Sequence, residues 1–147
     1  MERQKYYTHS PQETFELGEK WGKECRGGEI MALQGELGAG KTVFVQGVAQ
    51  GLGYKEVVNS PTFVLMQLYE LTENENEIAY LCHIDAYRVH SSEEIQNAGV
   101  EDYLGREDTV CVVEWPARIS DILPSSTLYF SLDIQGENDR EISIKKT

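Results

Sequence analysis

Two short, uninterrupted apolar runs are the clearest structural pattern in the 147-residue sequence. They cover residues 30–33 (Ile-Met-Ala-Leu) and 110–113 (Val-Cys-Val-Val). A strand buried on both faces of a parallel sheet has this pattern, because neither of its faces meets water. Both runs are therefore predicted to be core strands.

Two longer segments have the spacing of amphipathic helices. The first starts at Ser10, where Ser-Pro-Gln-Glu combines an N-cap, a proline for the first turn and a capping box. It places Leu17, Trp21 and Cys25 on one face and ends at the glycine pair 27–28. The second repeats apolar residues at i, i+3, i+4 and i+7, namely Val45, Val48, Ala49 and Leu52.

The remaining elements are shorter. Strands are predicted at residues 63–69 and 77–84, joined by a polar turn, and a closing hairpin at 127–134 and 140–145. Short helical segments are predicted from Ser91 or Ser92 to Gln96, and from Pro116 to about Leu123. With about six strands, this is an α/β three-layer fold in one domain over residues 1–147, with helices flanking a mixed parallel and antiparallel sheet. Whether the last hairpin joins the main sheet stays open.

A glycine-rich motif connects the first core strand to the second helix. Residues 35–42 match G-x-x-x-x-G-K-[ST] in full, and the flanking elements are those that a P-loop requires. Backbone N–H groups of such a loop face phosphate oxygens. The expected nucleotide-binding residues are Glu36, Leu37, Gly38, Ala39, Gly40, Lys41 and Thr42. Lys41 supplies charge for the β- and γ-phosphates and the Thr42 hydroxyl a Mg²⁺ ligand, which makes the predicted fold P-loop NTPase-like.

Two acidic residues directly follow predicted strands. Asp85 comes directly after the strand at 77–84, and Glu114 directly after the strand at 110–113. Each alone is more often a helix cap or a surface residue, but a P-loop protein needs such acids for Mg²⁺ and for the attacking group. Glu114 follows the more apolar strand and is assigned to Mg²⁺. Asp85 is then the candidate that orients or deprotonates the attacking water, with the reverse assignment left open.

Other polar residues near these motifs have two interpretations each. The segment Ser60-Pro61-Thr62-Phe63 is either a plain turn or a loop that senses the γ-phosphate. Arg88 either neutralises phosphate charge or, by the simpler interpretation, pairs with an acid such as Asp85. His83 is interpreted as a core residue, and Trp115 as a buried aromatic at a strand end or a neighbour of the nucleotide.

The overall composition constrains location and partners. Twenty-five acidic against 13 basic residues give a net charge of −12, which disfavours direct, non-specific binding to nucleic acid. The sequence has no apolar run long enough for a membrane helix and no signal-peptide core, so a cytoplasmic protein is expected. Its three scattered cysteines, Cys25, Cys82 and Cys111, predict buried thiols rather than disulfides or a zinc site.

Taken in order, four motifs resemble those of the TsaE family, also called YjeE/YdiB. They are Gly35 to Thr42, the Ser-Pro-Thr-Phe segment 60–63, His-Ile-Asp-Ala-Tyr-Arg at 83–88 and Val-Glu-Trp at 113–115. The resemblance spans about residues 10 to 125. It implies an ATPase required for threonylcarbamoyladenosine modification of adenosine 37 in tRNA, with weak hydrolysis unless its partners TsaD and TsaB are present.

The resemblance also implies roles for individual residues. Lys41 and Thr42 are implied to bind phosphate and Mg²⁺, Glu114 to bind Mg²⁺, and Asp85 to be the catalytic acid, with Thr62 in a switch-like loop. Contact with tRNA is implied only through the partner complex. The cofactors are ATP or ADP with Mg²⁺.

Three other functions share parts of this pattern. A small kinase needs an acceptor site and a lid, and no Arg-rich lid segment is evident. A GTPase is disfavoured because no [NT]-K-x-D stretch is present. A non-hydrolysing module that uses ATP only as a conformational ligand is mildly disfavoured by the presence of both Asp85 and Glu114.

Overall fold

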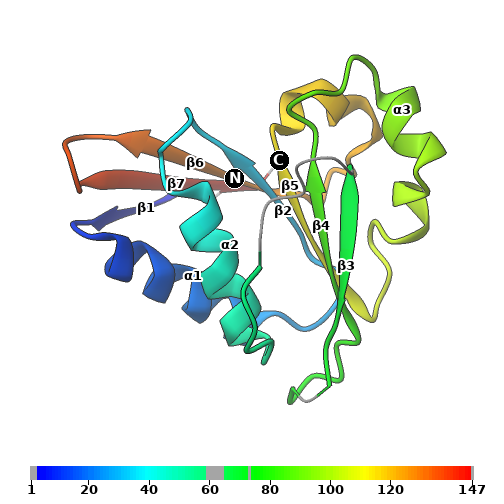
Figure 1. The fold of residues 1–147 in the computed structure, drawn as a ribbon, viewed down its shortest axis with the longest axis horizontal. Coiled ribbons are helices and arrows are strands. Elements are labelled where there is room, and N and C mark those ends of the chain that lie inside the picture. Colours follow the sequence, from blue (N-terminus) through cyan, green and yellow to red (C-terminus); the bar gives the residue numbers. More distant parts are fainter. Residues whose placement is uncertain (1–2, 59–64, 73, 147) are drawn as a thin grey trace.

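The computed structural model describes residues 3–58, 65–72 and 74–146 (Figure 1). Within these residues one seven-stranded sheet has the order β1-β7-β6-β2-β5-β4-β3. Its strands are β1 (Arg3–Thr8), β2 (Ile30–Gln34), β3 (Met66–Glu70), β4 (Tyr80–Asp85), β5 (Thr109–Glu114), β6 (Leu128–Ile134) and β7 (Arg140–Lys146). The four central strands β6, β2, β5 and β4 are parallel, and antiparallel strands flank them on both sides.

Helices cover both faces of this sheet. Helices α1 (Pro11–Glu24) and α2 (Lys41–Gly51) lie on one face, and α3 (Ser92–Asn97) with the 3₁₀ segments η1 (Val100–Asp102) and η2 (Pro116–Ile122) lies on the other (Figure 1). Successive residues of β5 alternate between the two cores: Val110 and Val112 contact the first, Cys111 and Val113 the second. The predicted three-layer α/β fold is confirmed.

The closing hairpin joins the main sheet. Strand β6 pairs in parallel with β2, and β7 pairs with β6 and β1. The question left open by the sequence is thereby answered: the hairpin lies beside the strand that leads into the glycine-rich loop (Figure 1).

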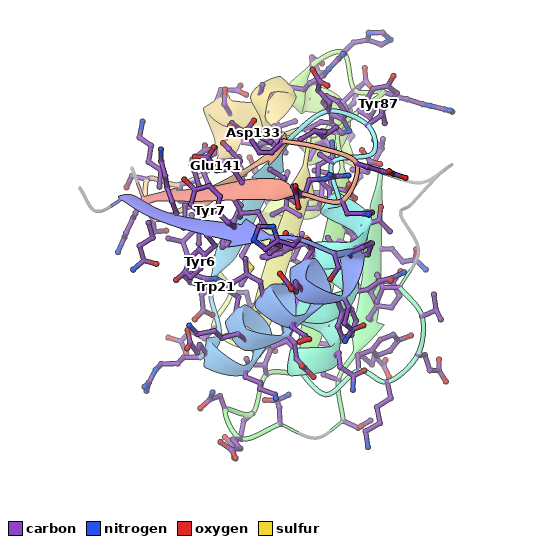
Figure 2. All side chains as sticks on the ribbon, turned by 90° about the vertical axis from the view of Figure 1, so that its left-hand side faces the viewer. Tyr6, Tyr7, Trp21, Tyr87, Asp133 and Glu141 are labelled. Atoms are coloured by element: carbon purple, nitrogen blue, oxygen red, sulfur yellow. The ribbon has the colours of Figure 1, made fainter. Side chains whose placement is uncertain are left out.

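The prediction of about six strands missed β1. Its sequence, Arg-Gln-Lys-Tyr-Tyr-Thr, has neither an apolar run nor a clear apolar alternation, and β1 is an edge strand that pairs only with β7 among the described residues. Figure 2 shows Tyr6 and Trp21 on the side of the sheet that α1 covers, with Asp133 and Glu141 on the other side. The predicted strand 63–69 begins at Met66 among the described residues, and the strand predicted from Glu77 begins at Tyr80.

The start of α1 has the predicted cap in modified form. The Ser10 hydroxyl accepts a hydrogen bond from the Glu13 N–H at 3.1 Å. The Glu13 carboxylate accepts from the backbone N–H of His9, at 2.9 Å, rather than from that of Ser10.

The cysteines, at positions 25, 82 and 111, are buried free thiols, as predicted. No helix of the described part of the chain is long and apolar enough to cross a membrane.

Glycines bring α1 and α2 into direct backbone contact. A Cβ atom added at Gly18 would lie 2.3 Å from the carbonyl oxygen of Phe44, and one at Gly47 would lie 2.1 Å from that of Phe15. The predicted apolar face of α1 is correct: Leu17 and Trp21 pack against the core, and Cys25, the C-cap of the helix, is part of it. The contact with α2 nevertheless depends on a different set, which includes Gly18.

We expect Gly47→Ala to lower the free energy of unfolding by about 1–3 kcal/mol, because the added methyl group meets backbone that cannot rotate away. Alanine favours a helix by about 1 kcal/mol over glycine, so propensity alone predicts the opposite sign. Urea denaturation of the nucleotide-free protein measures the difference. Gln50→Ala, at an exposed position of the same helix, is the control and should change stability by less than about 0.5 kcal/mol. A Gly47→Ala protein as stable as the unchanged chain would contradict the close contact.

Candidate nucleotide site

The glycine-rich loop leaves β2 and turns sharply into α2. Gly38 and Gly40 have φ angles of 83° and 100°, a region that glycine adopts without strain. Inside the loop, the Ala39 N–H donates to the Glu36 carbonyl at 3.1 Å. Gly40 is the N-cap of α2, so the loop ends at the positive end of that helix. This arrangement suits an anion.

Lys41 is the first residue of α2 and is almost buried, with 6% of its surface exposed. Its ammonium donates to the Gly35 carbonyl at 2.6 Å and lies 3.6 Å from the centroid of the Trp115 ring. Burial lowers the pKa of Lys41, and the nearby carboxylates Glu114 and Asp85 act in the opposite direction. The cation is therefore held at the base of the loop.

Asp85 and Glu114 are register partners at the ends of β4 and β5. Glu114 also pairs with Leu33, near the end of β2, so the ends of three parallel strands meet at the start of the loop. Asp85 is half-buried, and burial raises its pKa, an effect that a hydrogen bond from the Tyr87 N–H to its Oδ1 at 2.9 Å partly opposes. The two carboxylates and Lys41 form one charged cluster.

This cluster lines a cavity of about 380 Å³. Its walls come from the loop, from α2 and from the strand ends, and they are Leu37, Gly38, Gly40, Lys41, Thr42, Val43, Asp85, Tyr87, Glu114 and Trp115. A volume of this size falls in the range of small-molecule sites. Of the residues expected from the motif to bind nucleotide, Glu36 and Ala39 do not line the cavity. Ala39 is buried beneath the loop, and Glu36 is exposed.

His83 is fully buried and contacts Glu114, which sequence reasoning missed. Its Nε2 lies 2.7 Å from the Glu114 Oε2, so that the carboxylate accepts a hydrogen bond from a buried ring. The ring Nδ1 has no hydrogen-bond partner among the described residues. The interpretation of His83 as a core residue is therefore incomplete, because the ring also fixes one oxygen of a site carboxylate. The available signal was the i, i+2 spacing to Asp85, which places both side chains on one face of β4.

Trp115 follows Glu114 in a left-handed backbone conformation, with φ at 59° and ψ at 52°. Non-glycine residues adopt this conformation at some cost in free energy. The ring packs against Tyr87, with 4.9 Å between the centroids, and against the Lys41 ammonium. Trp115 is thus a partly buried aromatic at a strand end, which agrees with the first interpretation, and it also contacts Lys41. Its expected place beside a nucleotide stays a prediction. Tyr87 itself projects outward (Figure 2).

Two further candidate features were expected near the nucleotide. Ser60 and Thr62 lie outside the described residues. Arg88 is exposed and makes no ion pair with the rest of the described chain, so its expected pairing with Asp85 is not found. The chain turns after Asp85, and the Asp85 carboxylate instead accepts from the Tyr87 N–H.

The side chains around the cavity fit a hard cation such as Mg²⁺. The Thr42 hydroxyl and the carboxylates of Asp85 and Glu114 supply only oxygen donors, the ligands that Mg²⁺ prefers. The same cavity contains Lys41 and the glycine-rich loop, so an anion and a cation would be held next to each other. This is the donor set that a nucleotide with Mg²⁺ requires.

A glycine-rich loop between a parallel strand and a helix, with acids at the ends of neighbouring strands, defines a P-loop NTPase-like fold. The crystal structure of YdiB from Bacillus subtilis superposes with a TM-score of 0.75 and 31% identity, covering 97% of this chain and 84% of that one. The family model "Threonylcarbamoyl adenosine biosynthesis protein TsaE" matches residues 8–142. The chain belongs to the TsaE family.

Individual relatives agree with this assignment. The protein named tRNA threonylcarbamoyladenosine biosynthesis protein TsaE from Bacillus subtilis is 34% identical over 97% of this chain and 85% of its own length. The protein of the same name from Treponema pallidum is 37% identical over 93% of this chain and 96% of its own. The resemblance found from the four motifs is thus confirmed.

We expect Asp85→Asn to stabilise the nucleotide-free protein at neutral pH. Because the pKa of folded Asp85 is raised, folding disfavours its charged form, and stability is lost as pH rises through the raised pKa. Asparagine keeps the oxygen that accepts from the Tyr87 N–H but carries no charge. Thermal unfolding from pH 3 to pH 8 measures the gain, which should be largest at neutral pH and vanish below the ordinary carboxyl pKa of 3.8.

Asp133→Asn, at an exposed position of β6, is the matched control for this prediction. It removes the same charge from the acidic chain without touching the cavity. If both substitutions raise the unfolding temperature equally, the gain reflects net charge, and burying the charge of Asp85 does not destabilise the fold as predicted.

Proposed function

We propose that this chain binds ATP with Mg²⁺ and hydrolyses it weakly, as an ATPase required for threonylcarbamoyladenosine modification of tRNA. The observation that carries the proposal is the cavity where Lys41, Thr42, Asp85 and Glu114 meet beneath the glycine-rich loop. The family model and the relatives are named for threonylcarbamoyladenosine biosynthesis, and for this reason we assign the ATPase to that modification.

In this proposal, Lys41 exchanges its present contacts for the phosphates. The Gly35 carbonyl and the Trp115 ring keep the ammonium at the cavity while no anion is there. Phosphate oxygens are stronger partners for a buried ammonium, since they carry full negative charge. Mg²⁺, held by Thr42 and Glu114, would neutralise further phosphate charge.

The structure favours Glu114 as the Mg²⁺ residue and Asp85 as the residue that orients or deprotonates water. The hydrogen bond from His83 fixes the Glu114 carboxylate, and ligand carboxylates are commonly oriented by such contacts. Asp85 is less buried, and its raised pKa brings it closer to neutral pH, where a general base is more effective. The reverse assignment is the alternative that the substitutions below test.

Partners enter the proposal through the family. TsaD and TsaB are the proposed partners, and tRNA is contacted only through their complex. A net charge of −12 fits a subunit that does not bind the tRNA backbone itself. One domain over residues 1–147 is proposed to act in the cytoplasm.

Two other functions use the same cavity. A small kinase would transfer the phosphoryl group to an acceptor instead of water. A non-hydrolysing module would use ATP only to select a conformation. Both bind nucleotide, so hydrolysis and its dependence on partners distinguish them from the proposed ATPase.

We expect the protein alone to hydrolyse ATP slowly, and the addition of purified TsaD and TsaB to raise the rate severalfold. Phosphate release measured with and without the partners tests this. Lys41→Ala is the blank and should abolish the activity, because it removes the cation that contacts the phosphates. If the hydrolysis rate is the same with and without the partners, the assignment to tRNA modification is wrong. ATP binding without phosphate release would favour the non-hydrolysing module.

We expect Asp85→Asn and Glu114→Gln to impair hydrolysis in different ways. Asp85→Asn should lower kcat by about 10²–10⁴-fold without shifting the Mg²⁺ dependence, because it removes a general base. Glu114→Gln should raise the Mg²⁺ concentration needed for half-maximal activity, because it weakens a ligand. Titration of Mg²⁺ at saturating ATP measures both, with Asp133→Asn as the control. An exchanged pair of results would assign the two roles the other way.

A further inference from the structure

Arg140, the first residue of β7, connects the closing hairpin to the glycine-rich loop. Its Nε donates to the Ala39 carbonyl at 3.1 Å and its Nη2 to the Gly38 carbonyl at 3.0 Å. More than one hundred residues of sequence separate the two ends of these bonds. Figure 2 shows the β6–β7 turn in front of the loop that enters α2. The hydrogen bonds of Arg140 join these two segments.

The other side of the guanidinium holds the β6–β7 turn. Nη1 donates to the carbonyls of Gly136 at 3.0 Å and Asp139 at 2.9 Å, with a longer contact to Glu137 at 3.4 Å. The turn is itself closed by the Gln135 N–H, which donates to the Asp139 carbonyl at 2.9 Å. One planar group thus joins the loop to a hairpin that is part of the sheet.

Every one of these acceptors is a backbone carbonyl, and Arg140 makes no ion pair within the described part of the chain. Arg140 therefore does not stabilise the fold through an ion pair with a carboxylate of the described residues. Its donors are instead arranged as a fixed fork that sets the direction of carbonyl groups. A lysine has neither this planarity nor enough donors to replace it.

The carbonyls that Arg140 holds belong to the two peptide units on either side of Ala39. In a trans peptide the carbonyl and the N–H point in opposite directions, so fixing the Ala39 carbonyl also fixes the Gly40 N–H on the other side. Gly40 and Gly38 line the cavity, whereas Ala39 is buried beneath it. The other N–H, that of Ala39, already donates to the Glu36 carbonyl. Arg140 therefore controls the direction of the Gly40 N–H, in the loop that the proposed function assigns to phosphate.

We propose that Arg140 is a positioning residue for nucleotide binding: through its bonds to Gly38 and Ala39 it holds the glycine-rich loop in the shape that receives phosphate. Arg140 is not among the residues that line the cavity, so it acts on the loop and does not itself bind the nucleotide. The inference rests on the proposed function for its ligand, although the restraint on the loop also exists without nucleotide. The loop, which has positive φ at Gly38 and Gly40, would otherwise sample other conformations, and ordering it would reduce affinity.

The test compares Arg140→Lys, Arg140→Gln and the control Lys145→Gln. Lys145 lies exposed on the same strand, so its substitution removes the same charge away from the loop. We expect both Arg140 variants to raise the Kd for ATP, measured by calorimetry, about tenfold, since each loses bonds from a charged donor. In kinetics the loss should appear mainly in KM rather than in kcat.

Arg140→Lys separates geometry from charge. If the lysine variant binds ATP as tightly as the unchanged protein while the glutamine variant does not, the cation acts only by its charge and the proposal is wrong. Equal affinity of all variants would likewise overturn it. A general loss of structure is distinguished by far-ultraviolet circular dichroism, which should be the same for Arg140→Lys and the control.

A second measurement does not depend on ATP. Hydrogen exchange of the loop amides in nucleotide-free protein should be faster in Arg140→Gln than in Lys145→Gln, and unchanged in α1, which lies outside the restraint. If the unchanged protein binds no ATP, the proposed function fails, while faster exchange still supports the restraint on the loop. Unaltered exchange would overturn the inference even if ATP binds.

Discussion

The parallel pairing of β5 with both β2 and β4 is the constraint on which the site depends. It sets Leu33, Glu114 and Asp85 in register at one edge of the sheet. The glycine-rich loop begins directly after β2, so the strand register by itself brings the two carboxylates close to Lys41. In parallel sheets ligands bind at the carboxyl ends of the strands for this reason. A one-residue slip of β5 would turn Glu114 away from the cavity, because successive side chains point to opposite faces.

Features encoded locally could be predicted from the sequence. The loop at 35–42, the core strands at 30–33 and 110–113, and the acids that end two strands follow from short patterns. Features that depend on distant partners could not. Strand β1 is defined by β7 rather than by its own polar sequence, and Arg140 contacts a loop one hundred residues earlier. His83 likewise has its partner, Glu114, on the neighbouring strand, and the two motifs that contain these residues do not show that they are in contact.

The glycines of α1 and α2 show a second limit of periodicity. Apolar spacing correctly predicts that Leu17 and Trp21 pack against the core, but it assigns no role to residues without side chains. The helices approach each other closely at glycines such as Gly18 and Gly47, whose missing Cβ atoms allow backbone to approach backbone. Since α2 starts at Lys41, this contact also fixes the direction from which the helix N-terminus approaches the cavity. Packing far from the loop is thus connected to the position of the site.

The site holds groups that would be more stable elsewhere. Lys41 is nearly buried, the pKa of Asp85 is raised by burial, and Trp115 adopts a left-handed conformation. Such features destabilise a fold and persist only where the surrounding structure determines them. Here the sheet fixes the carboxylates, α1 fixes α2, and Arg140 fixes the loop. An anionic ligand would reduce the part of this cost that comes from Lys41, because its negative charge would compensate the ammonium and the helix N-terminus together. Ligand binding and stability should therefore be coupled at this end of the sheet.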